Sequence, residues 1–158
     1  DNGDLQTTPG HAIEYSYIAR YLVDVFDEYA VEKIAFDDWN MRHLRPWLIE
    51  AGLSEEFIDE HFEPFRQGYK SMSPALRDLE ASLLNGRIRH GSHPVLDMCA
   101  ANATVRADEA GNRKLDKKRS SGRIDGMVAL TMAHSVMPME GEAEPVSPWE
   151  DPNFSLPG

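Results

Sequence analysis

Hydrophobic residues recur at helical spacing along most of the chain. Between Ile13 and Tyr29 they lie three or four positions apart, which predicts an amphipathic helix. Ser54 is a residue type that favours a helix start, and the His93-Pro94 pair opens a further apolar segment. Together these signals predict additional helices at about residues 41–51, 53–61, 93–102 and 124–136.

Ser73-Pro74 and Asn85-Gly86 predict the two ends of another helix. Serine favours the N-cap position and proline is tolerated in the first turn. Asn-Gly is typical of a helix end, because both residues tolerate the backbone conformation found there. The leucines between these two pairs recur at helical spacing and would form the apolar face of this helix.

The strand signals are shorter. Residues 33–36 form an apolar run that contains a β-favouring aromatic, and they predict a short buried strand. Residues 62–67, interrupted by Pro64, and residues 87–90 are weaker strand candidates.

A hairpin is predicted at residues 103–107 and 113–116, because Gly111-Asn112 between them favours a tight turn. The resulting order of helices and strands predicts a single domain of the α/β or α+β class, with a small sheet.

Two carboxylates, Asp37 and Asp38, directly follow the strand predicted at residues 33–36. In α/β proteins the carboxyl ends of the strands are where functional groups gather. Because side chains alternate along a strand, the two acids should point in different directions, and at most one should face a shared site. We expect Asp37 to be that residue, with Asp38 as the alternative. The other interpretation is that both acids form only a turn and a helix cap.

Asp125 is the one acid of the helix predicted at residues 124–136, and it lies in the first turn. This helix is apolar on nearly every face, which predicts that it is buried. The acid has two explanations. It interacts favourably with the helix dipole, or it is a metal ligand at the edge of the core, because a buried acid is costly unless it is paired or coordinated.

The 158-residue chain has a formal net charge of −11 at pH 7, which argues against a general nucleic-acid binder. The charge is unevenly distributed. Residues 113–123 contain six basic residues and one acid, whereas residues 136–158 contain five acids and no lysine or arginine. The basic loop could therefore still contact a polyanion, and a solvated turn is the alternative explanation.

Other residue types exclude several classes of protein. The single cysteine, Cys99, rules out an internal disulfide framework and fits a reducing cytoplasm. No apolar run approaches the roughly 18 residues that a membrane span requires. The histidines form no zinc pattern. Trp39 and Trp47 are expected to be core or packing residues, and Trp39 has the alternative role of walling a site beside Asp37.

Asp37 and Asp125 would form one site if the strand end and the helix start converge. Carboxylates grouped in this way bind Mg²⁺ or Mn²⁺. Two such ions roughly 3.5–4 Å apart would activate a water and stabilise the leaving oxygen during phosphodiester cleavage. The basic residues just before Asp125 would contact DNA phosphates without reading the base sequence. These residues are Lys117, Lys118, Arg119 and Arg123.

Several short stretches resemble the C-terminal nuclease domain of tailed-phage terminase large subunits, the DNA-packaging motors. Each is weak alone, but their order and spacing over about residues 8–135 make the match fairly specific. The stretches are Ile34-Ala-Phe-Asp-Asp-Trp-Asn, Gln67-Gly-Tyr-Lys-Ser-Met-Ser-Pro-Ala, Leu84-Asn-Gly-Arg-Ile-Arg-His, Asn102-Ala-Thr-Val, Ala110-Gly-Asn, Asp116-Lys-Lys and Arg123-Ile-Asp-Gly-Met-Val-Ala-Leu.

The resemblance implies an RNase H-like α/β fold with a small central mixed sheet flanked by helices. It also implies a divalent-metal-dependent endonuclease that cuts concatemeric double-stranded viral DNA by two-metal hydrolysis. The acids of the family lie on a first strand, at the end of a later strand and on a C-terminal helix. Asp37 matches the second acid and Asp125 the third, and the first has no counterpart here.

The missing first strand predicts a partial domain. Residues 1–135 would be a nuclease domain that is incomplete at its N-terminus, and residues 136–158 an acidic, proline-rich tail. Such a fragment of a longer protein would bind metal weakly and cut poorly unless the strand is supplied. The implied partners are double-stranded DNA, the terminase ATPase domain, the small terminase subunit and the portal protein, in the cytoplasm of a bacterial host cell.

Two alternatives remain open from the sequence. The chain could be a non-catalytic acidic module that docks on another packaging protein through its proline-rich tail. It could also be another RNase H-like nuclease, such as a resolvase, and only the matched stretches outside the acids argue against that.

Overall fold

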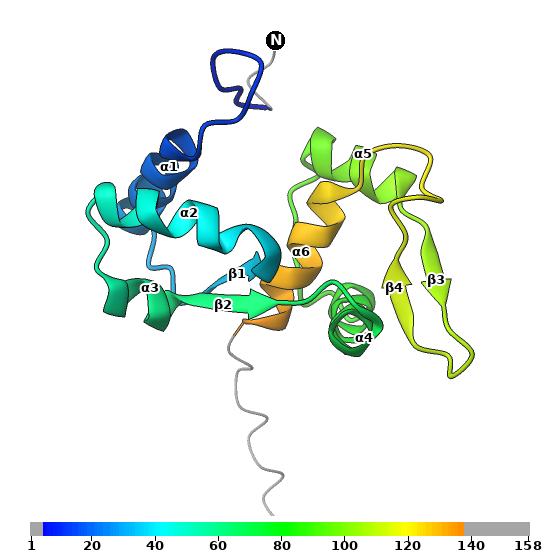
Figure 1. Ribbon diagram of the computed structural model, residues 1–158. Helices are drawn as coiled ribbons and strands as arrows, with labels where there is room; N and C mark the ends of the chain where they lie inside the picture. Colours follow the sequence, from blue (N-terminus) through cyan, green and yellow to red (C-terminus); the bar gives the residue numbers. More distant parts are fainter. Residues whose placement is uncertain (1–4, 138–158) are drawn as a thin grey trace, which may run out of the picture.

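The computed structural model of the chain describes residues 5–137 (Figure 1). Its helices are α1 (Tyr15–Glu28), α2 (Asp38–Glu50), α3 (Glu55–His61), α4 (Tyr69–Leu84), α5 (Pro94–Asn102) and α6 (Asp125–Ser135). Its strands are β1 (Ile34–Asp37), β2 (Phe62–Phe65), β3 (Val105–Ala107) and β4 (Arg113–Leu115). Helices and short strands are therefore interspersed along the chain, as the sequence predicts for an α/β or α+β domain.

β1 and β2 form a two-stranded parallel sheet, in which Ile34 pairs with Phe62 and Asp37 with Phe65. Parallel strands need a crossover connection, which α2 and α3 supply. The carboxyl ends of both strands consequently lie at the same end of the sheet. Asp37, the last residue of β1, is thus placed beside the residues that follow β2.

The helices α1, α2 and α3 surround one of two apolar clusters. Its buried residues are Ala19, Leu48, Ile58 and Phe62. Ser54 accepts a hydrogen bond from the backbone N–H of Phe57 at 3.1 Å, so that it caps α3 as predicted. This half of the molecule holds β1 in place from one side.

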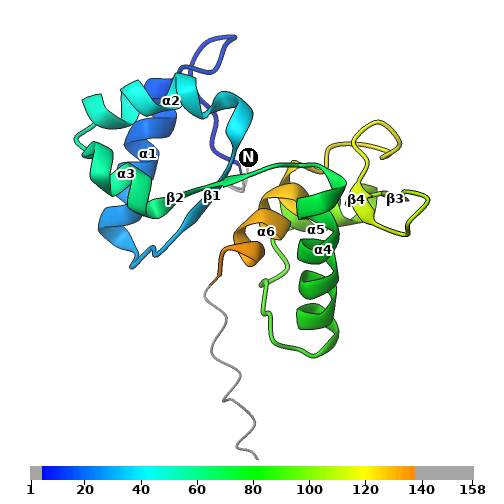
Figure 2. The same cartoon turned by 60° about the horizontal axis from the view of Figure 1, so that its bottom comes forward.

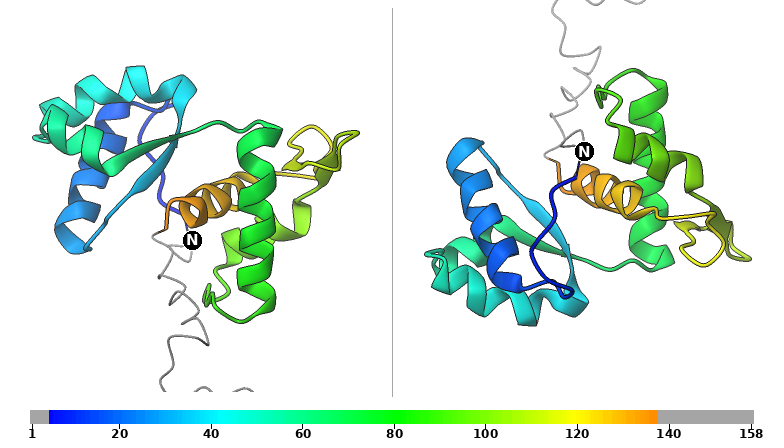
Figure 3. Two further views of the ribbon diagram at one scale, coloured as in Figure 1. Left: turned by 90° about the horizontal axis from the view of Figure 1, so that it is seen from below. Right: turned by 90° about the horizontal axis from the view of Figure 1, so that it is seen from above.

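The second apolar cluster lies among α4, α6 and the β3–β4 hairpin. Its buried residues are Phe65, Met72, Ala75, Leu115, Ile124, Val128 and Met132. Ala35 of β1 packs against this second cluster, whereas Ile34 and Phe36 pack against the first. Because side chains alternate across a strand, β1 joins the two clusters. Figures 2 and 3 show α6 running between the α1–α3 half and α4.

The β3–β4 hairpin is antiparallel, with Val105 opposite Leu115 and Ala107 opposite Arg113. Gly111 in its turn has φ of +80°, a conformation that favours glycine. In the described part of the chain this hairpin is not joined to the β1–β2 sheet. The parallel and antiparallel pairings that the sequence predicts for one mixed sheet are therefore found in two separate sheets.

The predicted start of α4 at Ser73-Pro74 is wrong. The helix begins at Tyr69, with Gly68 as its N-cap, and Pro74 lies inside it. Ser73 Oγ instead accepts a hydrogen bond from the backbone N–H of Arg113 at 3.1 Å. The serine hydroxyl therefore holds the start of β4 and does not cap its own helix.

The small strand predicted at residues 87–90 is also wrong. This segment is an irregular connection that follows Gly86, whose φ of +66° ends α4 as predicted. None of the described strands pairs with it. Cys99 of α5 is buried, as the sequence predicts.

The predicted acidic tail falls almost entirely outside the described residues, since it covers residues 136–158 and the description ends at residue 137. No helix within residues 5–137 has both the length and the hydrophobicity that crossing a membrane requires.

Candidate metal centre

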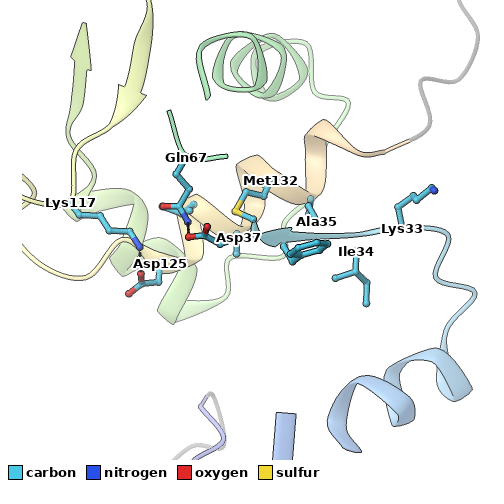
Figure 4. Close-up of a pocket in the computed structure, with 12 residues that line it drawn as sticks. Lys33, Ile34, Ala35, Asp37, Gln67, Lys117, Asp125 and Met132 are labelled. Atoms are coloured by element: carbon cyan, nitrogen blue, oxygen red, sulfur yellow. Dashed lines mark hydrogen bonds and ion pairs between the residues drawn. The ribbon is translucent and has the colours of Figure 1, made fainter. Parts of the chain in front are cut away.

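Asp37 and Asp125 line the same cavity, between β1 and α6 (Figure 4). The cavity has a volume of about 450 Å³, and Gln67 and Lys117 also line it. Most of the remaining wall is apolar and comes from β1 and α6. The structure thus brings together the two acids that the sequence analysis singled out, although they lie far apart in the chain.

Asp37 is held by a hydrogen bond on each carboxylate oxygen. Its Oδ1 accepts from the backbone N–H of Trp39 at 3.3 Å, which makes it the N-cap of α2. Its Oδ2 accepts from Gln67 Nε2 at 2.8 Å. Asp37 pairs with Phe65 in the parallel sheet, so Gln67 arrives beside it two positions later. The strand register therefore sets the orientation of this carboxylate.

Asp125 is the first residue of α6 and forms an ion pair with Lys117, whose Nζ donates to Oδ1 at 2.9 Å. This hydrogen bond lowers the pKa of the Asp125 carboxyl below its ordinary value, and the charges of Lys117 and Arg123 act in the same direction. The charge of the Asp125 carboxylate is thus already paired with Lys117.

The predicted burial of α6 is wrong for one of its faces. Asp125, Ala129 and Ala133 lie on successive turns and are all exposed, whereas Val128 and Met132, each one position earlier than an exposed alanine, are buried. The exposed face lines the cavity. Asp125 is thus not a costly buried acid, and burial no longer supports its explanation as a metal ligand. What supports that explanation is the shared cavity with Asp37.

Asp38 does not line the cavity that Asp37 and Asp125 share. It lines a second cavity together with Asp37, and its Oδ2 lies 3.7 Å from Arg66 Nε. Only one of the two neighbouring acids therefore shares a cavity with Asp125, as expected at the end of a strand. Trp39 borders the same second cavity and not the one that Asp37 and Asp125 share, and it is 73% exposed, so its prediction as a core residue is wrong.

The basic loop before α6 is ordered by Asp116. The Oδ1 of this residue accepts hydrogen bonds from the backbone N–H groups of Lys118 and Arg119, at 3.0 and 3.3 Å. Ser120 Oγ accepts from the backbone N–H of Thr104 at 3.1 Å, which ties the loop to the hairpin. The side chains predicted to contact DNA are all exposed on this loop: Lys117, Lys118, Arg119 and Arg123.

The two carboxylates suit a hard divalent cation whose other ligands are waters or substrate phosphates. Mg²⁺ is commonly bound by one or two carboxylates together with waters and substrate phosphates. Asp37 and Asp125 provide two carboxylates on one cavity. Among residues 5–137 there is no group of three His, Cys, Asp or Glu residues arranged to hold a metal. The residues present therefore fit an open site and not a closed all-protein cage.

The sequence profile of a family described as "Terminase large subunit, endonuclease domain" matches residues 1–141. The chain belongs to this family. It is 47% identical over 131 residues to the terminase large subunit of Enterobacteria phage HK97, and 28% identical over 135 residues to the protein YmfN of Escherichia coli K12. Each match covers 83% of the chain, but only 25% and 28% of the relative. This terminase nuclease domain thus spans about a quarter of the length of the curated relatives it matches.

Two solved structures share the fold. The crystal structure of the HK97 bacteriophage large terminase matches with a TM-score of 0.76 and 46% identity, over 84% of this chain and 27% of that one. The large terminase nuclease from thermophilic phage G20c matches with a TM-score of 0.59 over 80% of this chain and 64% of that one, at 15% identity. The predicted RNase H-like α/β fold is therefore confirmed.

The sequence did not predict two contacts in the cavity that Asp37 and Asp125 line. Gln67 was part of a matching stretch, but no local signal connected it with Asp37, thirty residues earlier. Lys117 was expected to contact DNA, and its bond to Asp125 was not foreseen, although both residues lie in matching stretches. Each contact depends on how strands and loops meet in three dimensions.

Proposed function

We propose that this terminase nuclease domain is a divalent-metal-dependent endodeoxyribonuclease, in which Asp37 and Asp125 hold Mg²⁺ or Mn²⁺. The observation that carries the proposal is the cavity that both carboxylates line. Membership of the endonuclease family supports the choice of DNA as the substrate.

The metal, when bound, would supply the activated water and the charge that stabilises the leaving oxygen. The residues of the chain do the positioning. Gln67 and the Trp39 amide fix the Asp37 carboxylate with both oxygens engaged, so its rotamer is set before a cation arrives. Lys117 is the present counterion of Asp125, and a bound metal would take its place.

The exposed basic loop would hold the phosphate backbone beside this cavity. Three exposed basic residues take no part in the Lys117–Asp125 ion pair: Lys118, Arg119 and Arg123. They lie in the segment just before α6. Arg119 Nε lies 3.8 Å from Asp116, a loose contact that a phosphate could replace. These contacts would place the duplex without selecting its sequence.

The packaging of concatemeric double-stranded viral DNA belongs to this proposal. So do the contacts with an ATPase domain, a small terminase subunit and a portal protein. The first acid of the family, which has no counterpart among the matched residues, would come from an additional strand, and until that strand is supplied we expect weak metal binding and poor cleavage.

The test is the variant Asp125→Asn in a form of the protein that includes such a strand. It should abolish Mg²⁺- or Mn²⁺-dependent cleavage of plasmid DNA while its circular dichroism spectrum and melting temperature stay as in the wild type. Retained cleavage would remove Asp125 from the mechanism.

A further inference from the structure

A second cavity meets the first at Asp37, and Asp125 does not line it. It has a volume of about 380 Å³ and shares Asp37 and Gln67 with the first. The rest of its wall is formed by the first turns of α2 and by the segment after β2: Asp38, Trp39, Arg42 and Arg66. We call the last three of these residues, Trp39, Arg42 and Arg66, the Trp39 surface.

The indole of Trp39 is the apolar part of this surface. It is 73% exposed, and the guanidinium of Arg42 lies over its ring at 5.7 Å from the centroid. A large aromatic face beside an arginine, open to solvent, is the arrangement on which proteins stack nucleotides. This indole is not part of either apolar cluster.

The two arginines supply charge that the fold does not use. Arg66 has an 83% exposed side chain, and its contact with Asp38 at 3.7 Å is the loose, solvated kind that contributes little. Arg42 donates from Nε to His43 Nε2 at 3.1 Å, a neutral partner when that histidine is unprotonated. If Asp37 serves a metal, two guanidinium groups face one remaining carboxylate, Asp38.

We propose that the Trp39 surface binds the DNA strand beside the cleavage position. Arg42 and Arg66 contact its phosphates, and Trp39 packs against the sugar and base of a neighbouring nucleotide. This inference rests on the proposed nuclease function and extends it. DNA is then held at two places near Asp37, by the basic loop at residues 117–123 and by the Trp39 surface.

The experiment measures binding of a fluorescein-labelled DNA duplex by the full 158-residue chain, by anisotropy in EDTA, so that cleavage plays no part. Trp39→Ala should weaken binding of the duplex about fivefold, the low end of the range for aromatic contacts with unpaired bases, because the bases of a duplex stack on one another. Trp39→Phe should restore most of the affinity. Arg66→Ala should weaken binding and lower the slope of log K against log salt by about 1, as one lost phosphate contact requires.

Two matched controls separate this surface from general effects. Arg77 is an exposed arginine paired with Asp78 at 3.1 Å, and Tyr21 is an exposed aromatic on α1. Arg77→Ala and Tyr21→Ala should bind the duplex as the wild type does. Melting temperatures confirm that each variant is folded.

The inference is overturned if Trp39→Ala and Arg66→Ala bind the duplex as tightly as the wild type. It is equally overturned if the wild type binds no DNA, or binds an acidic peptide through these residues and not DNA. The nuclease proposal fails separately, by the cleavage that Asp125→Asn would retain, because that variant leaves the Trp39 surface unchanged.

Discussion

Lys117 Nζ donates to Asp125 Oδ1 at 2.9 Å, so a proposed metal ligand carries its own internal counterion. The loop that supplies the lysine is held by Asp116, and the acid is the first residue of α6. The lysine occupies an oxygen that a bound cation would need. If Asp125 holds a metal as we propose, the affinity for that metal would be a balance between Lys117 and the incoming ion.

Replacing Lys117 should change that balance in a defined direction. In Lys117→Met the pKa of Asp125 should rise toward its ordinary value, because the hydrogen bond that lowers it is gone. Binding of Mn²⁺ should become several-fold tighter by calorimetric titration at pH 7, since the competing cation is removed. Lys118→Met is the control, and it should bind Mn²⁺ as the wild type does. Weaker binding in Lys117→Met would contradict the competition and indicate that the lysine supports the site.

Gln67 should act through Asp37 and not on the substrate itself. Its Nε2 donates to Asp37 Oδ2 at 2.8 Å, and outer partners of this kind typically contribute about 10–100-fold to metal affinity. We expect Gln67→Ala to lose Mn²⁺ affinity on this scale while DNA binding in EDTA stays unchanged. Unchanged Mn²⁺ affinity would show that the Trp39 amide alone is sufficient to orient Asp37.

The stability of the α1–α3 half should depend on its buried leucine. Leu48 of α2 is fully buried in the first apolar cluster, so Leu48→Ala should lower the free energy of unfolding by about 2–5 kcal/mol. Leu84→Ala is the matched control, because this leucine is 82% exposed and its loss should change stability by less than about 0.5 kcal/mol. Urea unfolding measures both. Equal effects would contradict the assignment of the core.

The ion pair of Asp59 with Arg45 should make the free energy of unfolding depend on pH in the acid range. Arg45 Nη1 donates to Asp59 Oδ1 at 2.7 Å, which lowers the pKa of Asp59 below its ordinary value of 3.8. A carboxylate with a lowered folded pKa stabilises the protein above its unfolded pKa, and this stabilisation is lost as the pH falls through the folded value. Wild type should therefore be more stable than Asp59→Asn at about pH 6, and the difference should vanish near pH 2. A difference that persists at the acid end would exclude this ion pair as its source.

The sequence predicted most helices and the meeting of the two acids, but not the contacts around them. A helix cap such as Ser54 is visible in the local sequence, and the start of α3 could therefore be predicted from it. α4 was misplaced because Gly68 caps it without a side-chain bond, while Ser73, which looks like a cap, bonds instead to the backbone of Arg113. The residues next to Ser73 in the sequence do not indicate that its hydroxyl bonds to a distant strand.

The surroundings of Asp37 could not be derived from spacing. Its bond to Gln67 requires the register of the parallel β1–β2 pair, and no local pattern fixes that register. Trp39 was expected in the core because aromatic residues are usually buried, but it belongs to neither apolar cluster, whereas Met41 in the same helical turn packs against the first. Functional surfaces are where this kind of expectation fails.

The most direct test is a thermal shift with millimolar Mn²⁺, comparing the wild type with Asp37→Ala and Asp125→Ala, in the 158-residue chain and in a longer form that supplies the additional strand. A ligand that binds the folded state raises the melting temperature by mass action. The wild type should show a shift, small in the chain and larger in the longer form, and each single variant should lose it, because both carboxylates hold the same cation. A shift that survives in either variant, or none in the longer form, would contradict a shared metal site at Asp37 and Asp125.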